Sequence, residues 1–494
     1  MGIVIALDAG TTGVRALAVD EAGDVVDVAY RELPQHFPRP GWVEHDLDEI
    51  WDGLVAVIGE LVERRPDPVA AVGITNQRET AAAWDRGTGA PRHRAIVWQD
   101  RRTAGRCDEL IEAGHLDLVR TTTGLVLDPY FTGTKFEWLL GPGGVTADDD
   151  LALGTIDSWL MWKLSGGAVH ATEPSNASRT MLYHIGDLAW SEELCDLLGV
   201  PAGALPSVRP SSGRFGTTAD TTALGAGVAI AGVAGDQQAA LFGQACLRRG
   251  MTKNTYGTGS FVLMNVGDSC PPPVDGLLTT VAWSLTDGGP ATYAYEGAIF
   301  VTGAAIQWLR DGLGIIDEAA DIGPLAASVD DTGDVYLVPA FTGLGSPWWD
   351  PYARGTLVGL TRGTGRAEIA RATVESMVYQ TRDVVDLMTS ASGQPPTELR
   401  VDGGASVMPL LLQLQADQLQ VPVTRPASEE TTALGAAYLA GLAEGVWDSV
   451  DDVATAWRAA VTFRPTVDAA AADAGHRRWL DAVARSRGWA RPRP

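Results

Sequence analysis

The chain carries the stretch Val228-Ala229-Ile230-Ala231-Gly232-Val233-Ala234-Gly235-Asp236-Gln237-Gln238, in which one carboxylate stands between an apolar run and the start of a helix. The continuous hydrophobicity of residues 228–233 predicts a buried strand, and residues 237–242 are typical of a packed helix. In α/β proteins ligands bind beyond the carboxyl ends of strands, which is where Asp236 falls, so this residue is a candidate catalytic base. Asp is equally favoured as a helix N-cap, and the stretch alone leaves both roles open.

A strand, a Gly/Thr turn and a second strand occur together twice along the chain. The first unit opens the sequence as a meander, with strands expected at residues 3–7, 14–19 and 25–30. The second unit lies near the middle, with strands expected at 253–256 and 261–265 around the turn Gly257-Thr258-Gly259-Ser260. The chain therefore contains two related hairpins, and we expect one in each of two domains.

Helical and strand patterns alternate between and after these hairpins, which predicts an α/β architecture. Helices are expected at 47–64, 158–164, 298–313, 366–390 and 409–419, and further strands at 69–75, 334–339 and 398–402. The segment Arg248-Arg249-Gly250 interrupts the pattern. We therefore expect an N-terminal domain at 1–247 and a C-terminal domain at 248–494.

Composition restricts the class of protein. A chain of 494 residues with 45% apolar and 20% charged residues is typical of a globular protein with two large domains, and its apolar runs are too short to span a membrane. A formal net charge of −25 argues against binding nucleic acid, which needs a basic face. The N-terminus resembles a first strand and not a signal peptide, and the four cysteines form no CxxC pair. We expect a cytoplasmic protein with no membrane insertion.

The turn Gly10-Thr11-Thr12-Gly13 is a candidate phosphate cradle, because glycine lets the backbone approach an anion and Thr hydroxyls can donate to phosphate oxygens. Arg15 would add a charge-assisted contact, and Asp8 would hold Mg²⁺ directly or through water. A single such turn is also compatible with an ordinary tight hairpin. Two of them, with Gly403-Gly404 as a third point of close approach, favour a nucleotide clamped between the halves. The absence of any Gly-Lys dipeptide excludes a Walker A loop.

The chain resembles the FGGY carbohydrate kinases, of the actin and Hsp70-like ATPase superfamily, nearly from end to end. The segments that carry the resemblance are 6–12 (ALDAGTT), 74–80 (ITNQRET), 95–102 (AIVWQDRR), 128–135 (DPYFTGTK), 234–243 (AGDQQAALFG), 254–259 (NTYGTG) and 339–347 (PAFTGLGSP). Their order and spacing are highly specific together. The resemblance implies two ribonuclease H-like domains with a cleft between them.

Within that family the chain is similar to the members that phosphorylate glycerol, and this implies the following site residues. The polyol would be bound by Arg78, Glu79, Trp98, Tyr130, Asp236, Gln237 and Phe261. ATP would be bound by Thr11, Thr12, Gly13, Arg15, Thr258, Gly259, Gly303, Gln307, Gly404 and Met408, with Mg²⁺ near Asp8 and Asp236. Taken singly, Arg78-Glu79 is also compatible with a solvated ion pair, and each aromatic residue with core packing.

The implied reaction transfers the γ-phosphoryl group of ATP to glycerol and gives sn-glycerol 3-phosphate, with Asp236 as general base. The resemblance also implies a homo-oligomer, a dimer or a tetramer. Ala9, Gly13 and Met408 differ from the residues usual in the family and affect the nucleotide site more than the polyol site. Two alternatives stay open: a kinase for another short polyol or dihydroxyacetone, and a non-catalytic actin-like ATP-binding regulator, which would not need Asp236, Arg78 or Glu79.

Overall fold

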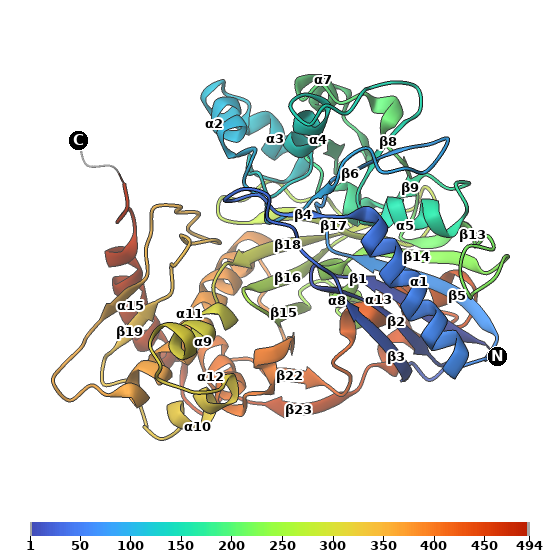
Figure 1. The fold of residues 1–494 in the computed structure, drawn as a ribbon. Helices are drawn as coiled ribbons and strands as arrows, with labels where there is room; N and C mark the ends of the chain where they lie inside the picture. The colour runs from blue at the N-terminus through green and yellow to red at the C-terminus, as the bar shows by residue number, and fades with distance from the viewer. Residues whose placement is uncertain (1, 492–494) are drawn as a thin grey trace.

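The computed structural model describes residues 2–491 and contains two large mixed sheets (Figure 1). The first has six strands in the order β13-β14-β5-β1-β2-β3. Their bounds are β1 Ile3–Ala9, β2 Gly13–Val19, β3 Val25–Glu32, β5 Val69–Asn76, β13 Ser212–Thr217 and β14 Ala229–Gly235. Strands β1, β5 and β14 run parallel to one another, and β2, β3 and β13 pair antiparallel with their neighbours.

The second sheet has seven strands in the order β17-β18-β16-β15-β21-β22-β23. Their bounds are β15 Thr252–Tyr256, β16 Ser260–Gly267, β17 Leu278–Ser284, β18 Ala291–Ile299, β21 Leu399–Asp402, β22 Val423–Pro426 and β23 Ala459–Phe463. From β18 to β23 the pairings are antiparallel, antiparallel, parallel, parallel and antiparallel. The first sheet shows the same sequence of pairings from β3 to β13. The two halves are therefore duplicates of one hairpin-led α/β unit, which confirms the predicted fold class.

The remaining elements cover these sheets or extend from them. The helices are α1 Leu47–Arg64, α2 Ala104–Glu112, α3 Leu116–Thr123, α4 Gly133–Leu140, α5 Ile156–Leu164, α6 Pro174–Ala177, α7 Glu192–Leu197, α8 Asp236–Gly243, α9 Gly303–Gln307, α10 Ile322–Ala326, α11 Arg366–Ser392, α12 Pro409–Leu419, α13 Thr431–Ala443, α14 Val450–Ala456 and α15 Ala469–Ser486. Short strands are β4 Glu44–His45, β6 Ala82–Asp85, β7 Ala95–Ile96, β8 Leu151–Gly154, β9 Ala171–Thr172, β10 Tyr183–His184, β11 Ala189–Trp190, β12 Ser207–Val208, β19 Tyr336–Val338 and β20 Thr356–Val358. Helices α2, α3, α4 and α7 gather at the top of Figure 1, beyond the first sheet.

Both faces of the first sheet are covered, and every residue of its parallel strands β1 and β14 is buried, which explains why these strands are predominantly apolar. Ile5 and Leu7 of β1 pack with α1 and α5 on one face, whereas Val4 and Ala6 point to the other face. That second core also contains Leu263 of the second sheet, together with residues of α8 and α13. One apolar core thus joins the two halves.

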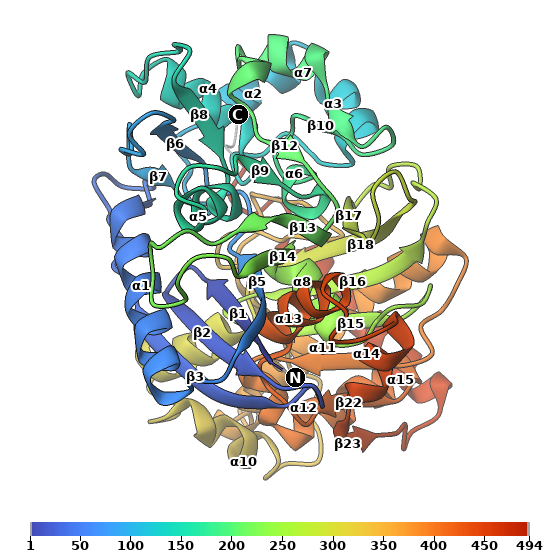
Figure 2. The same cartoon turned by 90° about the vertical axis from the view of Figure 1, so that its right-hand side faces the viewer.

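Helices α8 and α13 lie against each other between the sheets (Figure 2). Their backbones touch because glycine stands at the contacts. A Cβ on Gly435 would overlap the carbonyl oxygen of Ala239, and a Cβ on Gly243 would overlap that of Thr431. Because α13 follows β22 of the second sheet and α8 follows β14 of the first, this contact fixes how the two halves pack together.

Most expected elements are present, and two helices, α1 and α12, have the predicted bounds. The helix expected at 298–313 is wrong at its start. Ala298 and Ile299 instead complete β18, where they pair with Phe261 and Ser260, and the helix begins at Gly303. Cross-strand pairing overrides the helical propensity of alanine at that point. Within residues 2–491, no helix combines the length and the apolar character needed to cross a membrane.

We expect Gly435→Ala to destabilise the protein, because backbone atoms of α8 cannot move aside for the added methyl group. Overpacking of this kind costs about 1–3 kcal/mol. Gly59→Ala is the matched control, since no atom lies within 4 Å of a Cβ at that position of α1. Alanine is favoured there by about 0.5–1 kcal/mol. Thermal unfolding followed by circular dichroism should show a lower Tm for the first variant and a slightly higher one for the second; equal Tm values would refute the packing argument.

Candidate active site

Asp236 lies where the carboxyl ends of three parallel strands meet. Asn76 at the end of β5 pairs with Ala9 of β1 on one side and with Gly235 of β14 on the other. Asp236 is the first residue of α8, and the N-cap position belongs to Gly235. The Asp236 carboxylate accepts a hydrogen bond from the next backbone N–H, that of Gln237, at 2.7 Å. The N-cap interpretation is therefore wrong for Asp236.

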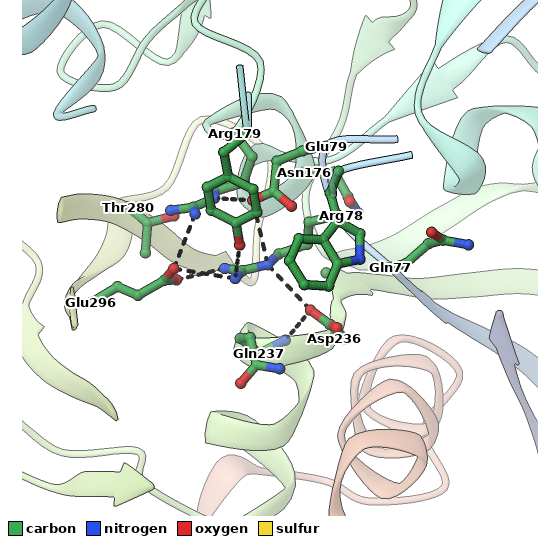
Figure 3. A network of polar contacts seen from close by, with 12 residues as sticks. Gln77, Arg78, Glu79, Asn176, Arg179, Asp236, Gln237, Thr280 and Glu296 are labelled. Atoms are coloured by element: carbon green, nitrogen blue, oxygen red, sulfur yellow. Dashed lines mark hydrogen bonds and ion pairs between the residues drawn. The ribbon is translucent and has the colours of Figure 1, made fainter. Parts of the chain in front are cut away.

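Arg78 is the centre of a polar network that connects the two halves (Figure 3). Its Nε lies 3.1 Å from Asp236 Oδ1, and its Nη1 lies 2.5 Å from Oε2 of Glu296 on β18. Nη1 also donates to Gln238 Oε1 at 3.2 Å, and Nη2 donates to the Tyr130 hydroxyl at 3.3 Å. The guanidinium is only 2% exposed, so its donors have fixed partners and a fixed direction.

Glu79 is held by a second buried arginine. Arg179 Nε donates to Glu79 Oε1 at 2.6 Å, and Arg179 Nη2 donates to Glu296 Oε1 at 3.0 Å. The backbone of Glu79 is left-handed, with φ of 59°, which is costly for a residue other than glycine. Lys135 supports that conformation, because its ammonium donates to the Glu79 carbonyl at 3.0 Å and to the Tyr130 carbonyl at 2.6 Å.

Charge compensation keeps Glu296 and Arg78 of this buried network ionised. Burial opposes ionisation of Glu296, but Arg179 and Arg78 outweigh it and lower the pKa of Glu296 to about 2. Burial likewise disfavours the charged Arg78, yet Glu296, Glu79 and Asp236 raise the pKa of Arg78 above its ordinary value. Such groups tolerate burial only because each meets opposite charge and hydrogen bonds. The alternative interpretation of Arg78-Glu79 as a solvated ion pair is excluded, since both side chains are buried.

Aromatic rings lie around the network. The Trp98 and Tyr130 rings pack edge to face with centroids 5.6 Å apart, and the Arg78 guanidinium lies 5.9 Å from the Phe261 ring. Trp98 Nε1 also donates to Thr11 Oγ1 at 2.9 Å, which links an aromatic wall to the first Gly/Thr turn. The structure therefore brings the seven predicted polyol residues into one neighbourhood.

Thr11, Thr12 and Gly13 form the tight turn from β1 to β2, closed by a bond from Gly10 N to Gly13 O at 3.0 Å. Gly13 is required there, since a Cβ would overlap the Tyr30 ring and the Arg31 carbonyl. Arg15 follows on β2. Its guanidinium pairs with Glu430 at 2.6 Å and with Asp8 at 3.6 Å.

The second turn is joined to the start of α9 by backbone bonds. Gly303 N donates to Gly257 O at 3.0 Å, and Thr302 N donates to Thr258 O at 2.9 Å. Thr258, Gly259 and Gly303 are therefore neighbours, with Gln307 exposed on the same helix. Gly404 follows β21, the parallel neighbour of β15, and has open space around its α-carbon. Met408 is buried in a core cluster with Ile322 and Leu411.

Asp8 and Asp236 are the residues suited to a magnesium ion. Burial raises the pKa of Asp8 to about 6; Arg15 opposes that shift, and the negative charges of Asp236 and Glu430 add to it. Two mutually repelling carboxylates of this kind are stabilised by a cation, and Mg²⁺ takes one or two carboxylates and keeps its waters. Among residues 2–491 no group of three or more His, Cys, Asp or Glu side chains could hold a metal. The donor set thus fits a hydrated Mg²⁺ and no all-protein metal cage.

Glu296 and Arg179 belong to the buried network, and the sequence did not predict either of them. Glu296 is a lone acid in the apolar strand Tyr293-Ala294-Tyr295-Glu296-Gly297, and that misplaced charge was the available signal. Arg179 follows α6, 100 residues from its partner Glu79. No spacing rule connects residues so far apart.

The duplicated α/β unit and the charged network between its copies define a two-domain α/β protein whose halves meet at a cluster of buried ion pairs. Two family models match the chain: the N-terminal domain of the FGGY family of carbohydrate kinases over residues 3–243, and the C-terminal domain of that family over residues 252–444. The chain belongs to the FGGY family of carbohydrate kinases.

Individual relatives match over nearly their full length. Glycerol kinase of Bordetella parapertussis is 55% identical, over 99% of this chain and 98% of that protein. Glycerol kinase 2 of Thermotoga maritima is 52% identical, over 99% of both chains. The crystal structure of Plasmodium falciparum glycerol kinase with ADP superimposes with a TM-score of 0.94 at 32% identity, covering 98% of each chain.

We expect Glu296→Gln to lower the stability strongly, because it leaves Arg78 and Arg179 with one compensating charge fewer. Breaking a buried ion pair costs about 3–5 kcal/mol. Glu60→Gln is the matched control, since Glu60 pairs with Arg31 at the surface and such pairs contribute little.

The acid dependence provides a second readout of the same change. Glu296 has a pKa lowered from 4.5 to about 2, so its stabilisation is present above pH 4.5 and is lost as the pH falls towards 2. Glu296→Gln should therefore show a smaller loss of Tm over that window than the wild type. An unchanged acid profile would contradict the assignment of the charge.

Proposed function

We propose that this protein is a glycerol kinase, which transfers the γ-phosphoryl group of ATP to glycerol and forms sn-glycerol 3-phosphate. The observation that carries the proposal is the buried network of Arg78, Glu79, Asp236 and Glu296, which makes a rigid pocket of hydrogen-bonding groups beside aromatic rings. Relatives named glycerol kinases, 52–55% identical over the whole chain, support the choice of acceptor.

The pocket chemistry suits a small polyol. A triol presents several donors and acceptors and little apolar surface, so selective binding needs charged and amide groups of fixed direction. Arg78 supplies donors, Glu79 and Asp236 supply acceptors, and Trp98 and Phe261 supply faces for C–H groups. The side chains of Arg78 and Glu79 are 2% and 1% exposed. Their geometry is thus set before a ligand arrives, which reduces the entropy cost of binding.

Asp236 is the proposed general base. Its Oδ1 is occupied by Arg78 and the Gln237 N–H, and its side chain is 33% exposed, which leaves Oδ2 accessible from the pocket. Oδ2 would accept the proton of a terminal hydroxyl as that oxygen forms its bond to the γ-phosphorus and the bond from phosphorus to the ADP oxygen breaks. Arg78 would keep the carboxylate pointed at the hydroxyl throughout.

The nucleotide would lie across the two Gly/Thr turns. Thr11, Thr12 and Gly13 from the first half and Thr258, Gly259 and Gly303 from the second offer backbone N–H and hydroxyl donors for phosphate oxygens. Gln307, Gly404 and Met408 would lie towards the adenosine. Mg²⁺ held by Asp8 and Asp236 would neutralise phosphate charge. Support comes from the similarity to the Plasmodium falciparum enzyme solved with ADP.

Asp236→Asn should lower kcat by about 10² to 10⁴, the usual contribution of a general base, because the amide keeps the shape but accepts no proton. Glycerol affinity, measured by calorimetry, should stay close to the wild-type value. Steady-state assays coupled to ADP release provide the measurement. Turnover near the wild-type rate would remove Asp236 from the chemical step.

Glycerol should be the best acceptor, and 1,2-propanediol and 1,3-propanediol should be much poorer. Each diol lacks one hydroxyl, and a buried charged partner left without its hydrogen bond costs about 1–3 kcal/mol. A polyol panel compared by kcat/KM is the test. A higher kcat/KM for dihydroxyacetone, erythritol or xylulose would reassign the acceptor, and the absence of any phosphoryl transfer would favour a non-catalytic ATP-binding protein.

A further inference from the structure

Lys253 is a buried cation that the proposed chemistry does not use. It lies on β15 with no measurable exposure and is one of three lysines in the chain. Burial lowers the pKa of Lys253 to about 8, while Asp402 of β21, Asp236 of α8 and Glu296 of β18 favour the charged form and Arg78 disfavours it. Burying an ammonium group is unfavourable unless it is hydrogen-bonded, so the groups that accept its hydrogen bonds indicate its role.

Two contacts of the ammonium are defined. Nζ donates to Gln237 Oε1 at 2.5 Å and to Thr255 Oγ1 at 2.8 Å. Thr255 is already fixed by sheet pairing with Phe261 and Asp402. The bond to Gln237 is different, because it joins a side chain of the first half to a strand of the second.

A lysine ammonium only donates hydrogen bonds, so it can accept just one orientation of a glutamine amide. The oxygen of Gln237 must face Lys253, and the NH₂ group must face away from it. That nitrogen has no hydrogen-bond partner among residues 2–491. It is also not fully buried, so a ligand can reach it. Two N–H donors therefore remain available beside Asp236, where Figure 3 places the Gln237 side chain.

We propose that Lys253 is a positioning residue that determines acceptor specificity by locking the Gln237 amide with its N–H donors towards the acceptor. The inference rests on the proposed function of the same site. Its consequence is that the substrate atom facing Gln237 must be an oxygen with a free lone pair. Without Lys253 the amide can rotate and present its own oxygen, which repels that lone pair.

The test is a double-mutant cycle of Lys253→Met and Gln237→Leu, with KM for the acceptor as readout. Methionine matches the length of lysine and removes its donors. Each single variant should raise KM for glycerol by about tenfold or more, because a hydrogen bond is lost at a buried site. The double variant should be within about threefold of Gln237→Leu alone, since Lys253 acts through Gln237. KM for ATP should stay within about threefold of the wild type in all variants. Multiplied effects in the double variant would overturn the proposal.

Gln237→Glu covers the case in which Lys253→Met does not fold. The carboxylate keeps an oxygen for Lys253, so Tm should be at least that of the wild type, but it presents no N–H to the acceptor. Its KM for glycerol should rise by about tenfold or more. A wild-type KM in this variant would overturn the proposal on its own.

Polyol assays of the wild type distinguish a failure of this proposal from a failure of the proposed function on which it rests. If the wild type phosphorylates another polyol better than glycerol, the glycerol assignment fails, and the cycle is run with that polyol. Strong coupling between Lys253 and Gln237 then still supports the positioning role, and independent effects refute it. Binding of ADP, measured by calorimetry, confirms that each variant keeps an intact nucleotide site.

Discussion

The arrangement of this protein depends on neutralising one buried guanidinium. Arg78 cannot lose its proton at any physiological pH, so a side chain that is 2% exposed must be surrounded by carboxylates. Asp236 begins α8, directly after β14 of the first sheet, Glu296 lies on β18 of the second, and both lie within 3.1 Å of Arg78. Separating the halves would break the ion pair between Arg78 and Glu296 and would expose to water the apolar core that both halves share. The same contacts that form the pocket therefore hold the two duplicated units in register.

The fold is repeated, but the candidate site is asymmetric, because the two halves share a Gly/Thr turn and differ in their other polar residues. Each half brings a Gly/Thr turn to the carboxyl ends of its parallel strands, β1 in the first and β15 in the second. Two equivalent turns suit the phosphate chain of one nucleotide. The proposed acceptor needs a different chemistry, and the residues proposed to supply it follow β5 and β14, with contacts from Glu296 and Lys253 of the second sheet. The contact between α8 and α13, made close by Gly243 and Gly435, brings these groups together.

The sequence contained enough information for the fold and for much of the site. Apolar runs such as residues 228–233 and the paired Gly/Thr turns predict the parallel strands and the duplication, because strand and turn formation depend on local residues. The start of α9 was missed because Ala298 is helical by propensity and a strand residue by pairing. Glu296, Arg179 and Lys253 were missed because their roles depend on partners more than 15 residues away, as far as 218 for Arg78 and Glu296. Which residues pair over such distances depends on how the elements pack, and no local sequence pattern predicts that.

Arg78 and Asp236 differ in how separable their structural and chemical roles are. Arg78 contacts Asp236, Glu296, Gln238 and Tyr130, so replacing this residue would disturb both the packing of the two halves and the direction of Asp236. Asp236 has one oxygen, Oδ1, bound within the network, its side chain is 33% exposed, and removing its negative charge leaves Arg78 with Glu296 as partner. The cost in stability is therefore small at Asp236 and large at Arg78 and Glu296. The network thus places Asp236, the proposed base, at its exposed edge, where a change in the charge of this carboxylate would leave the buried ions balanced.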